Sequence, residues 1–438
     1  MKNKNSVVYL STIGFTLLFA VWLMFGILAI PIQKEFNLSE IEFGWLTAIA
    51  ILNGALWRLV FGIIADKYGG KKIFLVIIAI SCVFCFLISY ADSFNKLILY
   101  AFFLGIAGNS FSVGIAWNSA WFEKNEQGYA LGLFGAGNVG ASVTKIIGPT
   151  LIVLVPAAGL LNGNIPGGWR FIPFLYGILL IFMFFILLFF TPKIDLKPAQ
   201  NKSFIDSLQP LKQMRVWRFS LYYIIVFGAY VGLSVWLPKY YVDNYHLELR
   251  DAALLTALFI FPASLLRPLG GKLSDLFGPR KIMYIIFGVM LICLLFLGAP
   301  EGHIVLYLSN KYHPTGTVNV MRYTLGVIPF TVLIFFLGVC MGIGKAAVYK
   351  YIPEYFPKDV GSVGGLVGCI GALGGFFLPI TFSYVLKYTA IPQTSFFILF
   401  IITLISFIWL HITVIKIMSS EAPHLKKDIE EPLNNKDK

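Results

Sequence analysis

The sequence predicts an all-α membrane protein that crosses the bilayer twelve times, in two pseudo-symmetric bundles of six helices. Three observations support this fold class. The 438 residues are 58% hydrophobic and only 13% charged, with a mean hydropathy of +0.81, which is far from the composition of a soluble domain. Apolar stretches of transmembrane length recur along the chain, and a charged motif returns after a fixed interval. A multi-pass protein with the lipid bilayer as its surroundings is therefore expected.

Apolar stretches of about twenty residues, the length that a bilayer core requires, mark the expected helices. The first stretch is expected to be retained rather than cleaved, because it is long enough to span and lacks a small-residue cleavage site. The twelve predicted helices cover residues 8–31, 43–65, 73–91, 97–119, 128–155, 171–191, 219–241, 252–271, 281–299, 325–349, 361–386 and 395–417. An even number of crossings places both termini on one side of the membrane.

Basic residues in three loops predict which side that is. The loops after the second, sixth and eighth helices contain Lys67, Lys71, Lys72, Lys193, Lys197, Lys202, Lys212, Arg215, Arg218, Lys272, Arg280 and Lys281. Because cytoplasmic loops are enriched in Lys and Arg, we expect both termini in the cytoplasm and the chain in the cell (inner) membrane. These loops largely explain the net charge of +13, so the charge does not indicate nucleic-acid binding.

The five cysteines indicate no metal site. All of them lie in apolar helices, and the pair Cys82 and Cys85 has no histidine or second cysteine pair that could complete a zinc site. No nucleophile, base or metal cluster is apparent, so neither an enzyme nor a bound cofactor is expected. The polar tail at 418–438 is expected to be cytoplasmic, and disordered from Ser419 onward.

The second and eighth helices end in the same charged motif. The motif residues are Arg58, Gly62, Asp66, Gly69, Lys71 and Lys72, repeated as Arg267, Gly271, Asp275, Gly278, Arg280 and Lys281. The aspartates are 209 residues apart (275 − 66 = 209), and so are the arginines, which indicates a duplicated six-helix unit. The predicted halves are 1–191 and 219–417, joined by a basic cytoplasmic linker at 192–218. Anchoring by positive charge alone would not require the repeated glycines and aspartates.

Six plus six helices with the pattern G-x-x-x-D-x-x-G-x-[KR]-K in each half resemble the major facilitator superfamily. The resemblance covers nearly the whole chain. It implies two bundles that face each other across a central cavity and rock about a midplane site. It also implies a gating role, rather than substrate choice, for Gly62, Asp66, Gly271, Asp275 and Arg280.

Positive charges lie inside the predicted helices, although these helices contain no aspartate or glutamate. The interior cations that stand out are Arg58, Arg267, Lys145 and Lys345. Each arginine precedes its loop aspartate by eight residues, about 12 Å of helix, which places it near the middle of a core about 30 Å thick. That depth argues against the alternative, in which the arginines snorkel to the interface. Because buried charge is costly and usually functional, the expected partner is an anion from outside.

Other unusual residues fall at the same depth. Asn138, Phe111 and Phe227 lie about eight to ten residues from the cytoplasmic ends of helices five, four and seven. Tyr223 lies one turn from Phe227 on the same side of its helix. Any one aromatic residue here is as often part of the core as a ligand. The prediction of a site therefore rests on the depth that these residues share with the two arginines.

A planar anion fits such a layer best. A guanidinium group is planar and permanently charged, and its paired N–H groups match the oxygens of a planar oxyanion. Aromatic rings would provide a flat slot for nitrate or nitrite. Phosphate or sulfate would call for more donors and more positive charge, and a carboxylate metabolite would need room for its body.

Two glycine-rich stretches, FGAGNVGASVTK at 134–145 and GSVGGLVGCIGALGGFFLP at 361–379, lie in helices five and eleven. The first contains a GxGxxG pattern, but no strand precedes it and no acidic residue follows about twenty residues later, so dinucleotide binding is rejected. Close helix packing explains most of these glycines. We expect Gly137 and Gly371 also to lie beside the ion. Packing does not explain Asn138, whose amide needs hydrogen-bond partners.

GAGNVG in helix five and the run that ends GGFFLP in helix eleven resemble the two signature motifs of the nitrate/nitrite porter family. This resemblance implies a secondary transporter of nitrate, and possible transport of nitrite, by alternating access. It implies that Arg58 and Arg267 bind the anion and that Asn138 lies in or beside the site. It further implies aromatic walls at Phe111, Tyr223 and Phe227.

The coupling mechanism has two main alternatives, because the family contains proton-coupled nitrate importers and nitrate/nitrite exchangers. Lys145 and Lys345 are the coupling candidates, since a buried lysine can exchange its proton; a fixed counter-charge is the alternative role. The helix-ten stretch GIGKAAVYKYIPEYFP resembles the proton-coupled branch, which favours nitrate/proton symport over nitrate/nitrite antiport. Less favoured are an organic-anion or sugar-phosphate antiporter and a nitrate sensor. A monomer is expected.

Overall fold

The computed structural model describes residues 2–123, 126–196, 204–307, 317–356 and 360–421. Within these residues, ten helical spans are long and apolar enough to cross a bilayer. Two further pairs of helices, bent by 42° and 44°, bring the total to twelve when each pair counts as one span. The predicted all-helical membrane fold is therefore confirmed. Disorder was predicted from Ser419 onward, but the final helix continues to Glu421, so this boundary was wrong by three residues. The rest of the predicted tail lies outside the described residues.

Three groups of elements follow one another along the chain. The first half contains α1 (Lys2–Trp22), α2 (Phe25–Phe36), α3 (Glu40–Leu56), α4 (Arg58–Tyr68), α5 (Gly70–Ser89), α6 (Phe94–Leu104), η1 (Gly105–Asn109), α7 (Ser110–Trp121), α8 (Gln127–Ala136), η2 (Gly137–Val139), α9 (Gly140–Leu154), η3 (Gly168–Arg170) and α10 (Phe171–Phe190). The connecting segment contains α11 (Phe204–Leu208) and η4 (Gln209–Lys212). The second half contains α12 (Met214–Tyr223), η5 (Ile224–Gly228), α13 (Ala229–Tyr245), α14 (Leu249–Leu265), α15 (Arg267–Phe277), α16 (Pro279–Gly298), β1 (Gly302–Tyr307), β2 (Thr317–Tyr323), α17 (Val327–Tyr355), α18 (Val360–Thr389) and α19 (Thr394–Glu421).

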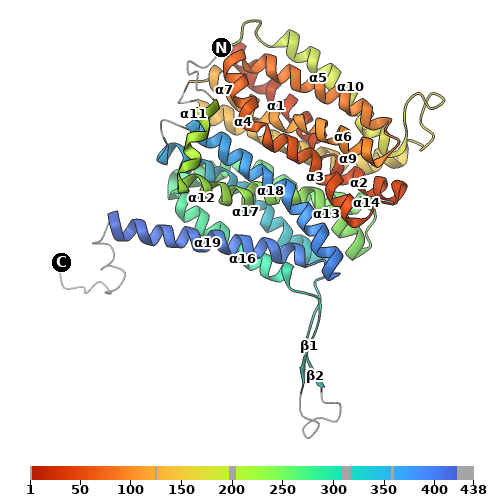
Figure 1. Ribbon diagram of the computed structural model, residues 1–438, viewed down its shortest axis with the longest axis vertical. Coiled ribbons are helices and arrows are strands. Elements are labelled where there is room, and N and C mark those ends of the chain that lie inside the picture. The colour runs from red at the N-terminus through yellow and green to blue at the C-terminus, as the bar shows by residue number, and fades with distance from the viewer. Residues whose placement is uncertain (1, 124–125, 197–203, 308–316, 357–359, 422–438) are drawn as a thin grey trace.

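The two halves of the chain form two adjacent groups of helices. In Figure 1 the red and orange helices lie beside the green and blue ones, and α19 runs along the outer edge of the helical body. The groups meet mainly where α3 packs along α18 and where α14 packs along α9. Helices two and eleven, and helices five and eight, therefore supply the contact surface between the halves. The domain boundaries at residues 191 and 219 stay a prediction.

Six of the spans are interrupted near their middle. Short non-helical joints separate α1 from α2, α3 from α4 and α14 from α15. Turns of 3₁₀ helix (η1 and η2) interrupt helices four and five, and a π turn (η5) interrupts helix seven. The stretch around Asn138, predicted as uninterrupted helix, thus tightens into a 3₁₀ turn while the span continues. Irregular backbone is tolerated at membrane depth where protein or a cavity surrounds it. The joints in helices one, four, five and seven lie among buried residues, whereas Trp57, the joint in helix two, is 47% exposed.

The spans differ widely in burial. Protein buries 89% of the most apolar window of the span Met214–Tyr245, but only 22% of that of Thr394–Lys416. The exposed apolar side chains of α19 and α16, such as Ile405 and Ile292, are therefore expected to face lipid.

The duplicated motif has the same backbone conformation in both halves. Gly69 and Gly278, which end α4 and α15, have φ angles of +99° and +80°. Residues with a Cβ atom rarely adopt this region, which explains why glycine stands at this point of each copy. The repeat in the sequence is thus also a repeat in structure.

One feature was not predicted from the apolar pattern. The loop between helices nine and ten contains a β-hairpin, in which β1 and β2 pair antiparallel with an irregularity between Ile304 and Val305. In Figure 1 the hairpin projects away from the helical body.

Candidate anion site

Two arginines from opposite halves meet at one aromatic ring. Arg58 is the first residue of α4 and Arg267 the first residue of α15, so each directly follows the bend of its span. Their guanidinium carbons lie 5.4 Å and 5.2 Å from the centroid of the Phe111 ring. Arg58 is 1% exposed and Arg267 is 9% exposed. The structure thus brings together the two arginines that the sequence placed at equal depth.

Arg58 is held by backbone oxygens and aromatic faces. Its Nη1 donates to the carbonyl of Gly368 in α18 at 3.3 Å, and its Nη2 donates to the carbonyl of Gly108 in η1 at 3.3 Å. The Trp22 and Phe227 rings lie 5.7 Å and 5.3 Å from its guanidinium carbon, in addition to Phe111. These contacts stabilise the buried charge without a carboxylate. Its Nε has no hydrogen-bond partner among the described residues.

Arg267 has fewer partners. Its guanidinium lies over Phe111 and, at 5.5 Å, over the Tyr349 ring. Its Nη1 is buried and has no hydrogen-bond partner within the described part of the chain. A Cβ atom at Gly135 would lie 3.3 Å from this nitrogen, so the glycine leaves space beside it. An unpaired buried donor costs free energy that an anionic acceptor would recover.

Asn138 is a further group without hydrogen-bond partners. It is fully buried in η2, and neither its Nδ2 nor its Oδ1 has a hydrogen-bond partner among the described residues. Its backbone carbonyl accepts a hydrogen bond from the Tyr230 hydroxyl at 3.3 Å. The free carboxamide supports the prediction that packing alone does not account for this residue.

The predicted aromatic pair forms a stacked wall. The Tyr223 and Phe227 rings are 5.1 Å apart and nearly parallel, and Tyr349 contacts Tyr223 edge-on at 5.0 Å. Gly371 makes this wall possible, because a Cβ atom there would lie only 2.3 Å from Cδ1 of Tyr223. Gly137 contacts helix one instead, where a Cβ atom would lie 2.6 Å from Cδ1 of Phe15. Both glycines thus have a packing role.

The two lysines occupy different places. Lys345 is fully buried beside the aromatic wall: its Nζ donates to the Ala263 carbonyl at 2.9 Å and lies 3.1 Å from the centroid of the Tyr230 ring. Lys145 is also fully buried, but its Nζ donates at 3.2 Å to the carbonyl of Leu23, at the joint between α1 and α2. Lys345 therefore adjoins the ring cluster, which consists of Tyr223, Phe227, Tyr230 and Tyr349. Lys145 instead stabilises the break in helix one.

Two of the predicted gating residues bind side chains within the second half, and in the first half the motif contacts the predicted linker. Asp275 forms an ion pair with Lys350, and Arg280 donates a hydrogen bond to the Tyr355 hydroxyl. In the first half the motif binds Asp195, which accepts from the Lys71 backbone N–H at 2.8 Å.

The remaining members of the motif show no crowding that explains them. A Cβ atom at Gly62 would lie 3.7 Å from Ser112, and one at the equivalent Gly271 would meet nothing within 4 Å among the described residues. Asp66 lies on α4, four residues after Gly62. The gating role stays a prediction.

Three ring residues and one cation were missed from the sequence. Trp22, Tyr230 and Tyr349 border the arginines or Lys345, and Lys239 is a further buried cation in helix seven. Helical spacing could have found two of the rings. Tyr230 follows Tyr223 by seven residues and Tyr349 follows Lys345 by four, so each lies on a helix face already under consideration.

Comparisons with known proteins identify the family. The family model described as Major Facilitator Superfamily matches residues 10–309 and 315–435. A curated relative from Thermus thermophilus, named probable nitrate/nitrite antiporter NarK1, is 61% identical over 98% of this chain and 96% of its own length. The chain belongs to the nitrate/nitrite porter family of the major facilitator superfamily. This porter is thus a membrane transporter and not an enzyme.

Other relatives of the porter agree with this placement. A nitrite extrusion protein from Bacillus subtilis is 32% identical over 90% of this chain and 91% of its own length. A probable nitrate transporter NarT from Staphylococcus epidermidis is 31% identical over 93% of this chain and 96% of its own. A solved bacterial homologue of the human lysosomal transporter Spinster, in an inward-facing conformation, superposes with a TM-score of 0.70 at 14% identity, over 94% of this chain and 97% of that one. The last comparison shows the fold alone.

Proposed function

We propose that this porter moves nitrate and nitrite across the cell membrane by alternating access, with Arg58 and Arg267 as the anion ligands. One observation supports the proposal: two buried guanidinium groups from opposite halves share the Phe111 ring, and each retains a buried N–H group that has no partner in the described part of the chain. An anion between them would satisfy donors from both halves at once. Binding would thereby link the halves that must move together.

The surroundings of the arginines favour a small planar ion. The charged groups are bordered mainly by the flat faces of Phe111, Phe227 and Tyr349. A tetrahedral phosphate or sulfate would leave oxygens against these faces without donors. Nitrate and nitrite have few oxygens, and these lie in one plane that the fork of a guanidinium group matches.

For coupling, the arrangement supports exchange of nitrate for nitrite. Among the described residues no carboxylate forms an ion pair with Arg58 or Arg267, so an empty carrier would change conformation with two uncompensated buried charges. If the porter carries one anion in each direction, an anion lies beside the arginines during both conformational changes, and that cost is removed. The name of the Thermus relative, a probable antiporter, is in keeping with this mechanism.

Proton symport, which the sequence favoured, is the second candidate. Its support is Lys345, a buried amine that donates only to the Ala263 carbonyl among the described residues and faces the Tyr230 ring. Loss of its proton on one side of the membrane would change the charge beside Arg267.

Labelled nitrate uptake into proteoliposomes tests both substrate and coupling. Vesicles would contain nitrite, nitrate or neither, with or without an imposed pH gradient. We expect uptake to require an internal anion and to respond weakly to the pH gradient. Accumulation in anion-free vesicles that follows the pH gradient would establish symport instead. Absence of nitrate uptake under all conditions, from folded protein, would refute the proposed function.

A competition panel separates nitrate from other anions. Unlabelled nitrite is expected to inhibit nitrate uptake, whereas phosphate, sulfate, a sugar phosphate and a dicarboxylate are expected to have no effect at equal concentration. Strong inhibition by an organic anion would identify an organic-anion antiporter.

We further propose that residues 1–191 rock against residues 219–417, with 192–218 as a cytoplasmic linker. Both termini would then lie in the cytoplasm, and the porter would act as a monomer in the inner membrane.

A further inference from the structure

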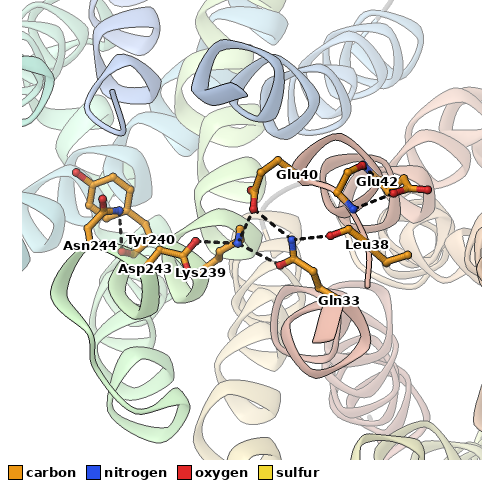
Figure 2. A network of polar contacts seen from close by, with 9 residues as sticks. Gln33, Leu38, Glu40, Glu42, Lys239, Tyr240, Asp243 and Asn244 are labelled. Carbon is orange, nitrogen blue, oxygen red and sulfur yellow. Dashed lines mark hydrogen bonds and ion pairs between the residues drawn. The ribbon is translucent and has the colours of Figure 1, made fainter. Parts of the chain in front are cut away.

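A cluster of polar side chains joins the two halves at the end of the molecule opposite the linker. At its centre is Lys239 of α13, whose side chain is only 8% exposed. Its Nζ donates to Oε1 of Gln33 at 3.1 Å and pairs with Oε1 of Glu40 at 3.2 Å and Oδ2 of Asp243 at 2.7 Å. Figure 2 shows the ammonium group between Asp243 on one side and Gln33 and Glu40 on the other.

Two of these three contacts cross between the halves. Gln33 belongs to α2 and Glu40 begins α3, whereas Lys239 and Asp243 are one turn apart on α13. An ammonium group has three hydrogens, so Lys239 has one partner for each. Breaking the contact between the halves would leave a largely buried charge with a single carboxylate.

Gln33 organises the side of the cluster that belongs to the first half. Its Nε2 donates to the Leu38 carbonyl at 3.2 Å and to Oε1 of Glu40 at 3.2 Å, which directs its Oε1 toward Lys239. The loop between α2 and α3 is thereby fixed in the position that receives the lysine. The Phe43 ring, 5.0 Å from the ammonium nitrogen, covers one side of the charge.

The halves are tightly packed beneath this cluster. A Cβ atom at Gly44 would lie 2.3 Å from Oγ of Ser383 in α18, and one at Gly26 would lie 2.9 Å from Cα of Val235 in α13. Such distances leave no room for an ion to pass. Phe43 adds an edge-on contact to Trp236 of α13.

The opposite ends of the central helices are less crowded. Among the described residues, Cβ atoms at Gly132, Gly271 and Gly361, near the cytoplasmic ends of helices five, eight and eleven, would meet nothing within 4 Å. The contact between the halves is therefore closer at the end that carries Lys239, which the predicted topology places outside the cell.

We propose that Lys239, Gln33 and Glu40 form an outer gate that holds the external side of the porter closed and must separate before an ion can enter from outside. The proposal rests on alternating access as part of the proposed function. Lys239 acts as a positioning residue that sets the balance between outward-open and outward-closed states. It does not touch the transported ion.

Thiol accessibility measures the gate without reference to nitrate. Ser234 is fully buried in α13, five residues below Lys239 in the interface with α2. In a background with the five cysteines replaced, Ser234→Cys would report entry of a small impermeant thiol reagent added outside intact cells. We expect Lys239→Met and Glu40→Gln each to raise the labelling rate about tenfold, the change in population that about 1.4 kcal/mol produces.

Two ion pairs within the first half provide matched controls. Lys96 pairs with Asp92 at 2.7 Å, and Arg170 pairs with Glu35 at 2.6 Å, both at the same end of the molecule. Asp92→Asn and Glu35→Gln should leave the labelling rate unchanged, because neither pair joins the halves. The charge swap Lys239→Glu with Glu40→Lys should restore slow labelling, at least in part.

The outcomes are decisive in either direction. Fast labelling in both gate variants, slow labelling in both controls and recovery in the swap would establish the gate. Unchanged labelling in Lys239→Met and Glu40→Gln, or equal acceleration in the control variants, would overturn it. Because the assay contains no nitrate, the gate can fail while nitrate transport stands, and the reverse. If Lys239→Met does not reach the membrane as folded protein, Glu40→Gln alone decides.

Discussion

The arginine sites of the two halves have the same sequence pattern but different surroundings. Both arginines directly follow a bend of similar angle, 42° for Arg58 and 44° for Arg267. Arg58 is bound to two backbone carbonyls, one of them in the opposite half, and lies among three aromatic rings. Arg267 lies against two rings and has a terminal nitrogen, Nη1, without a partner among the described residues.

This difference suggests a division of roles between repeated residues. The terminal nitrogens of Arg58 are bound to backbone carbonyls, one of which connects the halves even without a ligand, and only its Nε lacks a partner among the described residues. Arg267 instead has a terminal nitrogen, Nη1, available for a ligand. A duplicated sequence reproduces backbone geometry, but the neighbours of each copy decide what its side chain can do. Four predictions test whether the two arginine sites differ in function as they do in structure.

The largest effect is expected from Arg267→Lys and Arg58→Lys. Each keeps the charge but loses the planar fork, and the loss of charge-assisted hydrogen bonds of about 1.5–3 kcal/mol should lower nitrate affinity about 100-fold. Nitrate binding to purified protein and uptake into proteoliposomes would measure this loss.

Arg250→Lys is the matched control, because Arg250 is exposed at the start of α14, and it should bind nitrate normally. If the division of roles holds, Arg58→Lys should additionally loosen the contact between the halves, and Arg267→Lys should not. Normal transport by either site variant would disprove the assignment of the arginines.

A smaller effect is expected from Gly371→Ala, which should lower the rate of nitrate uptake into proteoliposomes about tenfold. The added Cβ atom would lie 2.3 Å from Tyr223, so the tyrosine must move and disturb the Phe227 ring that covers Arg58. Overpacking of this kind costs about 1–3 kcal/mol. Gly361→Ala in the same helix meets nothing within 4 Å and should transport normally. Equal activity of the two variants would mean that the wall on the Arg58 side is not part of the site.

Asn138→Ala is expected to weaken nitrate binding about fivefold, as for the loss of one hydrogen bond of about 1 kcal/mol. Its stability should be unchanged, because the amide has no partner to lose among the described residues.

Asn118→Ala provides the contrast. The Asn118 amide donates to Ser11 Oγ at 2.9 Å and to the Gly114 carbonyl at 2.8 Å, so this variant should be less stable to heat but bind nitrate normally. The reverse pattern, with Asn138→Ala less stable and unchanged in affinity, would assign Asn138 to packing.

The smallest effect on affinity, about threefold, is expected from Lys345→Met, which removes one positive charge near the site. Lys145→Met should change affinity less, because its Nζ donates to the Leu23 carbonyl away from the rings. The pH profile of transport then tests coupling. If the porter exchanges anions, both variants should keep the pH profile of the parent. Loss of a pH-driven component in Lys345→Met alone would favour symport.

The depth of residues in the membrane could be predicted, but their lateral position could not. Counting along each helix placed Arg58, Arg267 and Phe111 in one layer, and the structure brings these three together. From the sequence alone, Lys145 and Lys345 have the same role as coupling candidates, although only Lys345 adjoins the ring cluster. Depth follows from the rise per residue, whereas lateral position depends on how each helix is rotated and where it bends.

Residues around the joints were the hardest to foresee. Trp22 ends α1 just before a break, and Tyr230 follows a π turn, where the ordinary helical periodicity shifts. Lys239 passed unnoticed because its partners Gln33 and Glu40 are about 200 residues earlier in the chain, in the other half.

By itself the sequence determined the number of spans, the duplication, and the glycines that end α4 and α15, because hydropathy, spacing and φ preference are local properties of the chain. The tertiary structure alone decided which groups meet each buried charge. Arg58 and the Gly368 carbonyl are 310 residues apart, and Lys239 and Gln33 are 206 apart. Such pairs form only when the two halves pack together, and the resulting distances and rotations are not encoded in any single stretch of sequence.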